Sequence, residues 1–273
     1  MIDARIHSMN DYTENSKAQS MHVVVFTGGE FPLPGSTENY WKCTKAPDFI
    51  IAADSGLDAA ERYAAFWKKQ YNFTPDIILG DMDSLPCAAE KLATYPESKI
   101  IRHNPYKDYT DTELALDYAY KSAVSEKCPN LPEDTGKFIT LVGGSGGRTD
   151  HLLGIFDLFS TKLHPSAWLC SRQVLWYAEQ KSVFTVSNLA LDDAISIARS
   201  NGSRSGGKIE DKGLEWGCKV FRKDGMPSIS NRISKRYFEK HLPVQLTFYE
   251  GCFILMLPLT ASVAITKTSC SLK

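Results

Sequence analysis

Four short apolar runs in the first half of the chain each end in a turn rich in glycine, aspartate or threonine. The runs are Val23 to Phe26, Phe49 to Ala53, Pro75 to Leu79 and Phe138 to Val142. A short apolar run bounded by turn residues is typical of a buried strand. Because helical patterns follow several of these runs, we expect an α/β sheet whose ligands bind at the carboxyl ends of its strands.

The turns after the second and third runs are acidic. Asp54 follows one run directly, and the sequence Gly80-Asp81-Met82-Asp83-Ser84 follows the next. Two carboxylates about 5 Å apart repel by roughly 3 kcal/mol at an effective dielectric constant near 20. Carboxylates that converge on one point therefore need a cation, and hard oxygen ligands favour Mg²⁺. An isolated Asp-x-Asp is more often a solvated turn, but the run before this one places it at the ligand edge.

A third acidic cluster precedes a predicted helix. Thr110 and Glu113 have the spacing of a capping box, and apolar positions with helical periodicity follow them. The cap accounts for these two residues without any function. It does not account for Lys107, Asp108 and Asp111, which gather at the positive end of the helix, where phosphate or a metal–phosphate complex is favoured.

The fourth run leads into the glycine-rich turn Gly143 to Gly147. Amides such as those of Gly144 and Gly147 can approach phosphate oxygens closely, and Arg148 offers a bidentate fork to the same oxygens. The turn is neither a P-loop nor a complete dinucleotide fingerprint. Its specificity comes from Arg148 and Asp150, which follow it directly.

The second half of the chain is dominated by short strand-like runs, at 173–177, 182–186, 194–198, 244–249 and 252–257. Such runs, separated by turn residues, predict a β-sandwich or barrel. We expect a disordered N-terminal extension at residues 1–20, an α/β domain at 21–165 and a β domain at 166–273. Residues 201–208 are a flexible loop by composition.

Composition excludes several classes of partner. A formal net charge of -1 argues against nucleic acid, whose phosphates require a basic face. Seven cysteines without a Cys-x-x-Cys pair fit a reducing compartment. The first 20 residues lack the apolar stretch of a secretory signal, and the run from Cys252 to Leu259 is far shorter than the about 20 residues that span a membrane. We therefore expect a cytoplasmic protein.

Read in order, these motifs resemble the successive signatures of the thiamin pyrophosphokinase family. They are Ala53-Asp54-Ser55-Gly56, the motif from Gly80 to Ser84, the motif from Lys107 to Glu113, and the motif from Gly143 to His151. Two later motifs, at 213–216 and 228–231, resemble that family's thiamin-side motifs. The resemblance covers most of residues 21 to 260.

The resemblance implies transfer of a pyrophosphoryl group from ATP to the hydroxyl of thiamin, giving thiamin diphosphate and AMP, with Mg²⁺ required. It implies a Rossmann-like three-layer α/β domain that holds ATP and metal, followed by an all-β sandwich domain that holds thiamin. It also implies a homodimer in which each active site lies between subunits.

Roles for individual residues follow from the same resemblance. The acidic metal and nucleotide site is matched by Asp54, Asp81, Asp83 and Asp111. Phosphate contacts are matched by Thr110 and Arg148, beside Lys107, Asp108, Gly144 and Gly147 as further nucleotide-binding candidates. The thiamin pocket is matched by Asp150, a substrate-side acid, and by Trp216, Ser230 and Asn231. The candidates for catalysis are Asp81, Asp83, Asp111, Arg148 and Asp150.

Trp216 has two interpretations. A tryptophan in a β domain is usually part of the core. Between Gly213 and Gly217, however, it has little neighbouring bulk, which favours a strand with an exposed ring. Such a ring can bind the flat thiamin cation by stacking and cation–π contact, worth about 0.5 to 2 kcal/mol.

The sequence departs from the family pattern at a few positions. It has an additional N-terminal segment, Ser55 where a second glycine is common, and a long polar insertion around residues 201–212. Two other functions remain open at this stage. One is a haloacid-dehalogenase-like phosphatase with Asp81 as nucleophile, which requires a second acidic pair on the same sheet; the adjacent pair available is Asp192-Asp193. The other is a non-catalytic nucleotide or thiamin sensor.

Overall fold

The computed structural model describes residues 20–127, 136–200, 207–217, 222 and 224–268. The segment expected to be disordered, residues 1–20, lies outside these ranges except for Ser20. The loop expected at 201–208 lies outside them except for its last two residues.

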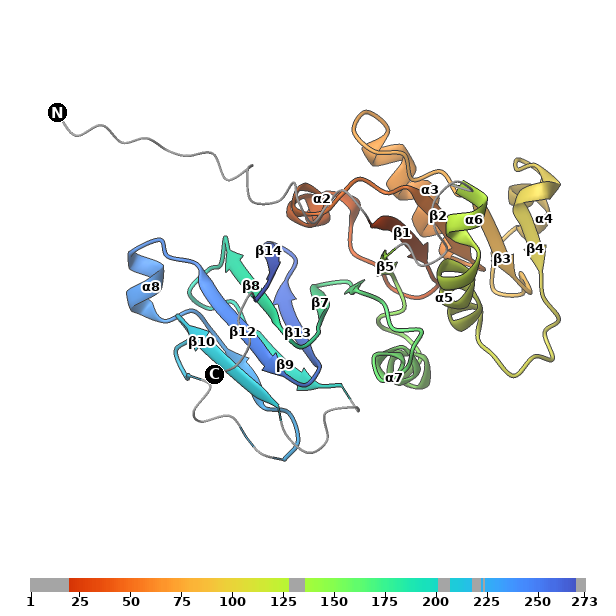
Figure 1. The fold of residues 1–273 in the computed structure, drawn as a ribbon. Helices are drawn as coiled ribbons and strands as arrows, with labels where there is room; N and C mark the ends of the chain where they lie inside the picture. The colour runs from red at the N-terminus through yellow and green to blue at the C-terminus, as the bar shows by residue number, and fades with distance from the viewer. Residues whose placement is uncertain (1–19, 128–135, 201–206, 218–221, 223, 269–273) are drawn as a thin grey trace.

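The first half of the chain alternates strands and helices (Figure 1). In order, it contains β1 (Met21–Phe26), η1 (Pro34–Thr37), α2 (Glu38–Cys43), β2 (Phe49–Ala53), α3 (Gly56–Trp67), β3 (Ile77–Gly80), α4 (Ala88–Leu92), η2 (Glu97–Lys99), β4 (Ile100–Arg102), α5 (Asp111–Lys121), α6 (Ala123–Lys127), β5 (Lys137–Val142) and α7 (Thr149–Leu158).

The second half consists mainly of strands. It contains β6 (Ala167–Leu169), β7 (Gln173–Ala178), β8 (Ser182–Ser187), β9 (Ile195–Arg199), β10 (Lys208–Lys212), β11 (Ser228–Asn231), α8 (Lys235–Glu239), β12 (Val244–Glu250), β13 (Phe253–Pro258) and β14 (Ser262–Lys267).

These strands form two sheets. The larger has ten strands in the order β11-β9-β13-β7-β6-β5-β1-β2-β3-β4, and the smaller has four in the order β10-β12-β8-β14. Pairing is parallel from β6 through β5, β1, β2 and β3 to β4. It becomes antiparallel where β6 meets β7. The fold is therefore mixed α/β, with one sheet that is parallel at one end and antiparallel at the other, and a second sheet that is wholly antiparallel.

Helices cover both faces of the parallel part. On one face, Val24 of β1 packs in the same core as Tyr63 of α3. On the other, Val25 packs with Leu116 of α5. All six residues of β1 are buried, which explains why the strands appear in the sequence as continuous apolar runs and not as alternating ones.

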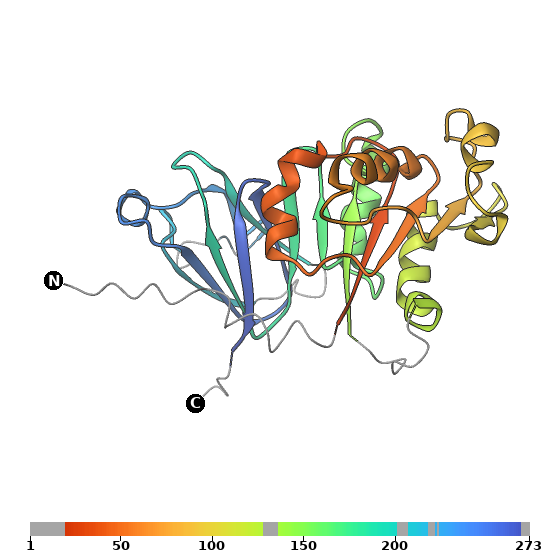
Figure 2. The same cartoon turned by 90° about the horizontal axis from the view of Figure 1, so that it is seen from above.

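The antiparallel part packs against the small sheet. Trp176 of β7 and Leu255 of β13 share a core with Phe184 of β8 and Phe248 of β12. The rings of the two phenylalanines meet edge to face at 5.6 Å. Two sheets that bury apolar faces against each other make the sandwich-like layer seen beside the α/β part in Figure 2.

Strand pairing and a hydrogen bond connect the α/β half of the chain to the all-β half. Strand β6 pairs with β5 on one side and with β7 on the other. Helix α2 lies near β14 (Figure 1), and the Asn39 amide donates to the carbonyl of Thr260 at 2.6 Å. A boundary at residue 165 thus falls within one continuous sheet, and the division into two domains stays a prediction. None of the helices described is both long enough and apolar enough to cross a membrane.

Candidate active site

Three aspartates meet at the carboxyl edge of the parallel strands. Asp54 follows β2, Asp81 follows β3, and Asp111 is the first residue of α5. One carboxylate oxygen from each lies within 4.8 Å of the others. Because β2 and β3 pair in parallel, with Ala53 opposite Leu79, their ends reach the same edge. Three of the four acids expected to converge therefore lie together at this edge, and their role as metal ligands stays a prediction.

Gly80 makes this convergence possible. Its φ is +143°, a conformation that side chains rarely adopt. A Cβ at this position would lie 3.1 Å from Cβ of Asp54 and 3.2 Å from Oδ1 of Asp111. Any side chain here would press into the space between two of the three acids.

Asp54 is the most buried of the set, with 6% of its surface exposed. Its backbone is left-handed, with φ of +48°. Oδ2 accepts a hydrogen bond from the Ser84 hydroxyl, while Oδ1 is buried without a hydrogen-bond partner among the described residues. Burial raises the pKa of Asp54; the Ser84 hydrogen bond opposes this, and the neighbouring carboxylates add to it.

Lys107 supplies positive charge between the other two acids. Its Nζ lies 2.7 Å from Oδ2 of Asp81 and 2.9 Å from Oδ1 of Asp111. Burial alone would lower the pKa of Lys107, but the hydrogen bonds to these carboxylates outweigh it and raise the pKa. The same contact lowers the pKa of Asp81.

Asp83 lies beside the cluster of three and outside it. Its side chain is exposed, and its backbone N–H donates to Oδ1 of Asp81 at 3.3 Å. A hydrogen bond to Asp81, together with that residue's charge, raises the pKa of Asp83. The structure therefore separates the four acids into three that converge and one at the rim.

The donor set fits a hard divalent cation. All the converging ligand atoms are carboxylate oxygens, the ligand type that Mg²⁺ prefers. Oδ1 of Asp54 is buried and has no donor in the part of the chain that the structure describes, which is an electrostatic cost that a bound cation would remove. Asp54, Asp81 and Asp111 are thus the residues suited to hold Mg²⁺.

Two threonines at the same edge escaped the sequence prediction. The hydroxyl oxygens of Thr27, directly after β1, and Thr112, in the first turn of α5, lie 2.6 Å apart. This contact ties the helix that carries Asp111 to the central strand. The sequence signal was the polar turn after the first apolar run, which marks an edge position without indicating its partner.

The glycine-rich turn packs tightly against the turn after β1. The N–H of Gly144 donates to the carbonyl of Gly28 at 2.7 Å, and the N–H of Glu30 donates to the carbonyl of Ser145 at 2.6 Å. The amide of Gly144 is therefore already used. Gly147, with φ of +64°, has open space around its Cα and is the better placed of the two to approach a ligand.

Arg148 and Asp150 form an exposed ion pair at the start of α7. Nε of Arg148 lies 3.2 Å from Oδ1 of Asp150, and Nη2 lies 2.6 Å from Oδ2. The hydrogen bond from Arg148 lowers the pKa of Asp150 to about 2. Asp150 is consequently a weak proton acceptor while this pair is intact.

The start of α5 has the predicted cap. Thr110 accepts from the N–H of Glu113, and the Glu113 carboxylate accepts from the N–H of Thr110, which completes the capping box. The Thr110 hydroxyl also donates to Glu113 at 2.8 Å. Asp108 is exposed just before this turn.

The residues matched to the thiamin pocket lie elsewhere. Trp216 lies in a bend rather than the expected strand, and the residue is 49% exposed, which agrees with the second of its two interpretations. It is held beside Asn231 of β11 by two hydrogen bonds. Ser230, with φ of +54°, lies in an irregular part of the same strand.

The chain does not bring this group to the acidic edge. In the large sheet, β11 and β2 are seven strand positions apart. At about 4.8 Å per position, that is a separation of roughly 34 Å. The acidic cluster and Trp216 therefore stand at well-separated parts of one chain.

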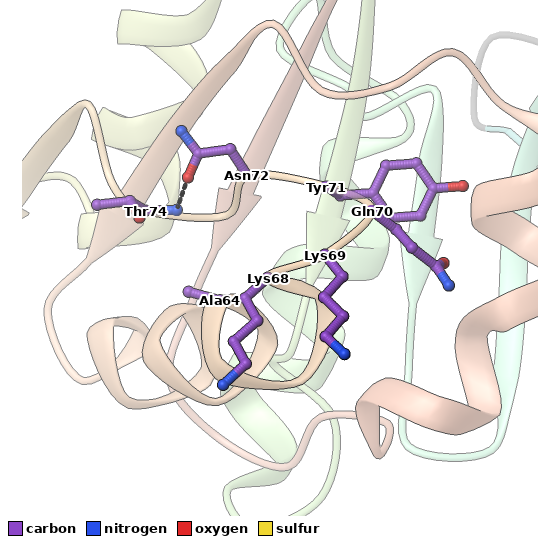
Figure 3. A pocket seen from close by; sticks show the side chains of 7 residues that line it. All are labelled: Ala64, Lys68, Lys69, Gln70, Tyr71, Asn72 and Thr74. Atoms are coloured by element: carbon purple, nitrogen blue, oxygen red, sulfur yellow. Dashed lines mark hydrogen bonds between the residues drawn. The ribbon is translucent and has the colours of Figure 1, made fainter.

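A hollow of about 470 Å³ follows the end of α3 (Figure 3). It is lined by Ala64, Lys68, Lys69, Gln70, Tyr71, Asn72 and Thr74. This segment leads into the amino end of β3, at the sheet edge opposite the three acids. The hollow contains none of the residues matched to the family.

The fold and the site together define a class: an α/β protein whose acidic sheet edge suits a phosphorylated ligand held through a cation. Residues 38–168 match a family model described as thiamin pyrophosphokinase, catalytic domain. Just under half of this chain is therefore similar to the thiamin pyrophosphokinase catalytic domain.

Solved structures share its fold. Thiamin pyrophosphokinase from Candida albicans matches with a TM-score of 0.58 and 14% identity, over 88% of this chain and 89% of that chain. The enzyme from Geobacillus thermodenitrificans matches with a TM-score of 0.57 and 18% identity, over 92% and 100%. Yeast thiamin pyrophosphokinase matches with a TM-score of 0.54 and 13% identity, over 89% and 87%. No curated protein sequence matches the chain.

Proposed function

We propose that this protein transfers a pyrophosphoryl group from ATP to the hydroxyl of thiamin, with Mg²⁺, and releases thiamin diphosphate and AMP. The observation that carries the proposal is the convergence of Asp54, Asp81 and Asp111 within a region that matches the thiamin pyrophosphokinase catalytic domain. In this reaction the hydroxyl oxygen bonds to the β-phosphorus of ATP, the bond from that phosphorus to the α–β bridging oxygen breaks, and the hydroxyl proton is released.

The acidic edge holds the nucleotide end of the reaction. Asp54, Asp81 and Asp111 would hold Mg²⁺, which would supply positive charge to the polyphosphate. Asp83, at the rim, is placed to orient that complex without belonging to the cluster of three. Phosphoryl transfer depends mainly on positioning and charge stabilisation, and these residues supply both.

Further residues complete the phosphate site. Lys107 bridges two of the acids, and Arg148 presents an exposed guanidinium at the start of α7. Gly147 offers an open approach, whereas Gly144, Thr110 and Asp108 shape the turns on either side. In this proposal Asp150 orients Arg148 and faces the substrate, and its low pKa keeps it charged.

The thiamin end is supplied by a second subunit. A polyphosphate site and an aromatic wall separated by roughly 34 Å across one sheet are too distant to share one small substrate. A C₂ homodimer would create two equivalent composite sites. In each, Trp216 and Ser230 contact thiamin, and Asn231 supports this wall through the backbone of Trp216.

Finer features of the fold belong to the same proposal. The α/β part is Rossmann-like in having three layers and carboxyl-edge ligands, and residues 166–273 form the thiamin-binding sandwich. We further propose a cytoplasmic enzyme, in keeping with its cysteine usage.

The two other functions gain nothing from the structure. The acidic pair that a phosphatase would need, Asp192-Asp193, lies between β8 and β9 in the antiparallel part, and Asp193 accepts the N–H of Ala190. A sensor has no need of a converged acidic cluster.

The test is a product assay with purified protein, thiamin, ATP and Mg²⁺. Thiamin diphosphate and AMP should form in equal amounts, and excess EDTA should abolish both. ADP with thiamin monophosphate, or no product under conditions in which the protein is folded, would refute the proposal.

A further inference from the structure

Asn231 is the most completely bonded polar side chain near the exposed tryptophan. It is 1% exposed, although it lies in a strand at the outer edge of the large sheet. A buried amide at such a place must satisfy its own donors and acceptor. Its partners therefore show what it does.

Two of its four partners are the backbone N–H and C=O of Trp216. Oδ1 accepts from the N–H of Trp216 at 3.2 Å and from the N–H of Arg232 at 2.9 Å. Nδ2 donates to the carbonyl of Trp216 at 2.7 Å and to the Ser228 hydroxyl at 3.3 Å. Both amide hydrogens and the amide oxygen are thus occupied within the chain.

Two backbone hydrogen bonds also fix the Trp216 segment to the residues that follow Asn231. The N–H of Glu215 donates to the carbonyl of Arg232 at 2.9 Å, and the N–H of Ser234 donates to the carbonyl of Gly213 at 2.8 Å. Asn231 extends this short pairing, because its side-chain amide accepts from the N–H of Trp216 and donates to the C=O of Trp216, as the backbone of a paired strand would. The backbone N–H and C=O of Trp216 thus have hydrogen-bond partners, and the segment that carries the exposed indole is fixed in place.

The ring has one face covered. The guanidinium of Arg232 lies over it, 5.2 Å from the ring centroid. With the guanidinium on one face, a flat ligand would have to stack on the opposite face. The 49% exposure of Trp216 is consistent with such an open face.

We propose that Asn231 is a positioning residue: it fixes the backbone of Trp216 so that the indole presents one open face to a flat cationic heteroaromatic substrate, while Arg232 covers the other face. This proposal rests on the proposed function, with thiamin as the substrate. It differs from a direct role for Asn231, because the amide has no hydrogen left to donate to a ligand.

Asn231→Asp is the informative variant. It keeps the size and the acceptor oxygen of the side chain, but turns a second oxygen toward the Trp216 carbonyl, where the amide donates. The matched control is Asn188→Asp, which removes an amide donor to the Thr260 carbonyl on an exposed loop elsewhere. Ser228→Ala removes a weaker partner of Asn231 and serves if Asn231→Asp does not fold.

Tryptophan fluorescence without any ligand gives the decisive reading. The other four tryptophans, Trp41, Trp67, Trp168 and Trp176, are at most 5% exposed. Acrylamide therefore quenches chiefly Trp216, and a Trp216→Phe protein identifies its signal. Asn231→Asp should shift the Trp216 emission and change its quenching, Ser228→Ala should do so less strongly, and Asn188→Asp should match the wild type.

Kinetics completes the test. For Asn231→Asp, the KM for thiamin should rise about tenfold, while the KM for ATP stays at its wild-type value. An unchanged Trp216 signal in a folded Asn231→Asp or Ser228→Ala protein would overturn the positioning role. If the wild type lacks thiamin pyrophosphokinase activity, the proposed function fails. The fluorescence experiment needs no substrate, so it still tests whether Asn231 positions Trp216.

Discussion

At the scale of single residues, the acidic site depends on backbone conformation as much as on charge. Asp54 has a left-handed backbone, with φ of +48°, and Gly80 has a φ of +143°. These two conformations let chain ends from adjacent strands turn their oxygens toward one point. A strained position of this kind is maintained only where the surrounding structure determines it, and here both strands are fully buried.

Asp111 and Asp117 offer a matched comparison on one helix. Asp111 lies in the cluster of three, whereas Asp117 pairs with the exposed Lys121. Asp111→Asn should lower kcat by about 100-fold or more, because it removes a carboxylate of the proposed metal site from a reaction that depends on charge stabilisation. Asp117→Asn should change kcat by less than about twofold, because it breaks only a solvated surface ion pair. Steady-state rates at saturating Mg²⁺ check this, and equal effects would contradict the assignment.

His22 is a buried polar residue without a catalytic role. Its Nδ1 faces the carbonyl of Lys45 and so carries the proton, which leaves Nε2 to accept from the Thr140 hydroxyl at 2.8 Å. Thr140 in turn accepts from Tyr40 at 2.6 Å. This chain of hydrogen bonds works with a neutral imidazole.

The network makes stability depend on pH. Burial lowers the pKa of His22 from 6.5 to about 4. Above pH 6.5 the ring is neutral whether the chain is folded or not, so it adds no pH dependence. As pH falls from 6.5 to 4, the unfolded chain binds a proton that the folded chain does not, and the free energy of unfolding falls by about 3 kcal/mol. Urea unfolding at pH 7.5 and 5.0 should show a smaller pH dependence for His22→Gln; the same dependence in both proteins would refute it.

The sequence predicted that the four acids lie near one another, but it did not predict which of them stays outside the cluster. Runs of buried strand residues placed Asp54 and Asp81 at one edge, and a helix cap placed Asp111 nearby. Nothing in the local sequence separates Asp83 from them, because its exposure depends on how the turn after β3 folds over Asp81. Thr27 and Thr112 were missed for the same reason: their contact joins positions 85 residues apart.

At the scale of elements, apolar strands were predicted and short or polar ones were not. The run from Phe49 to Ala53 coincides with β2. Strands β4 and β6 have three residues each, too few for a periodic signal. Strand β10 has the sequence KIEDK, and its charged side chains are tolerated because it lies at an edge of the small sheet.

The start of α7 carries a prediction of its own. Arg148→Lys keeps the positive charge there but loses the planar fork. We expect kcat/KM for ATP to fall about tenfold, with thermal stability unchanged because the Arg148 side chain is 71% exposed. Arg236→Lys, an exposed change on α8, is the control. A wild-type rate for Arg148→Lys would show that only its charge matters.

At the scale of the whole molecule, the sheet order has a direct consequence for function. The long sheet keeps the acidic edge and the Trp216 segment apart, with β9, β13, β7, β6, β5 and β1 between β11 and β2. This separation was not predictable from the sequence, because local patterns do not give strand order. It supports the proposal that the sites are composite and are formed between two copies of the chain.

Mixing two inactive proteins tests the composite site. An Asp111→Asn protein lacks a working acidic edge, and a Trp216→Ala protein lacks the aromatic wall. In a heterodimer of the two, one site combines both defects and the other has neither, so activity should return toward about a quarter of the wild-type level for random pairing. Subunit exchange is verified first with differently tagged chains. No recovery after verified exchange would contradict the shared site.

The central claim is that the thiamin oxygen attacks the β-phosphorus of ATP, and the fate of a label at that atom tests it most directly. The protein is incubated with thiamin, Mg²⁺ and ATP labelled at the β-phosphorus, and the outer phosphate of the product is then removed. We predict that the resulting thiamin monophosphate retains the label and that the nucleotide product is unlabelled AMP. Unlabelled thiamin monophosphate, with the label recovered in ADP, would contradict the claim.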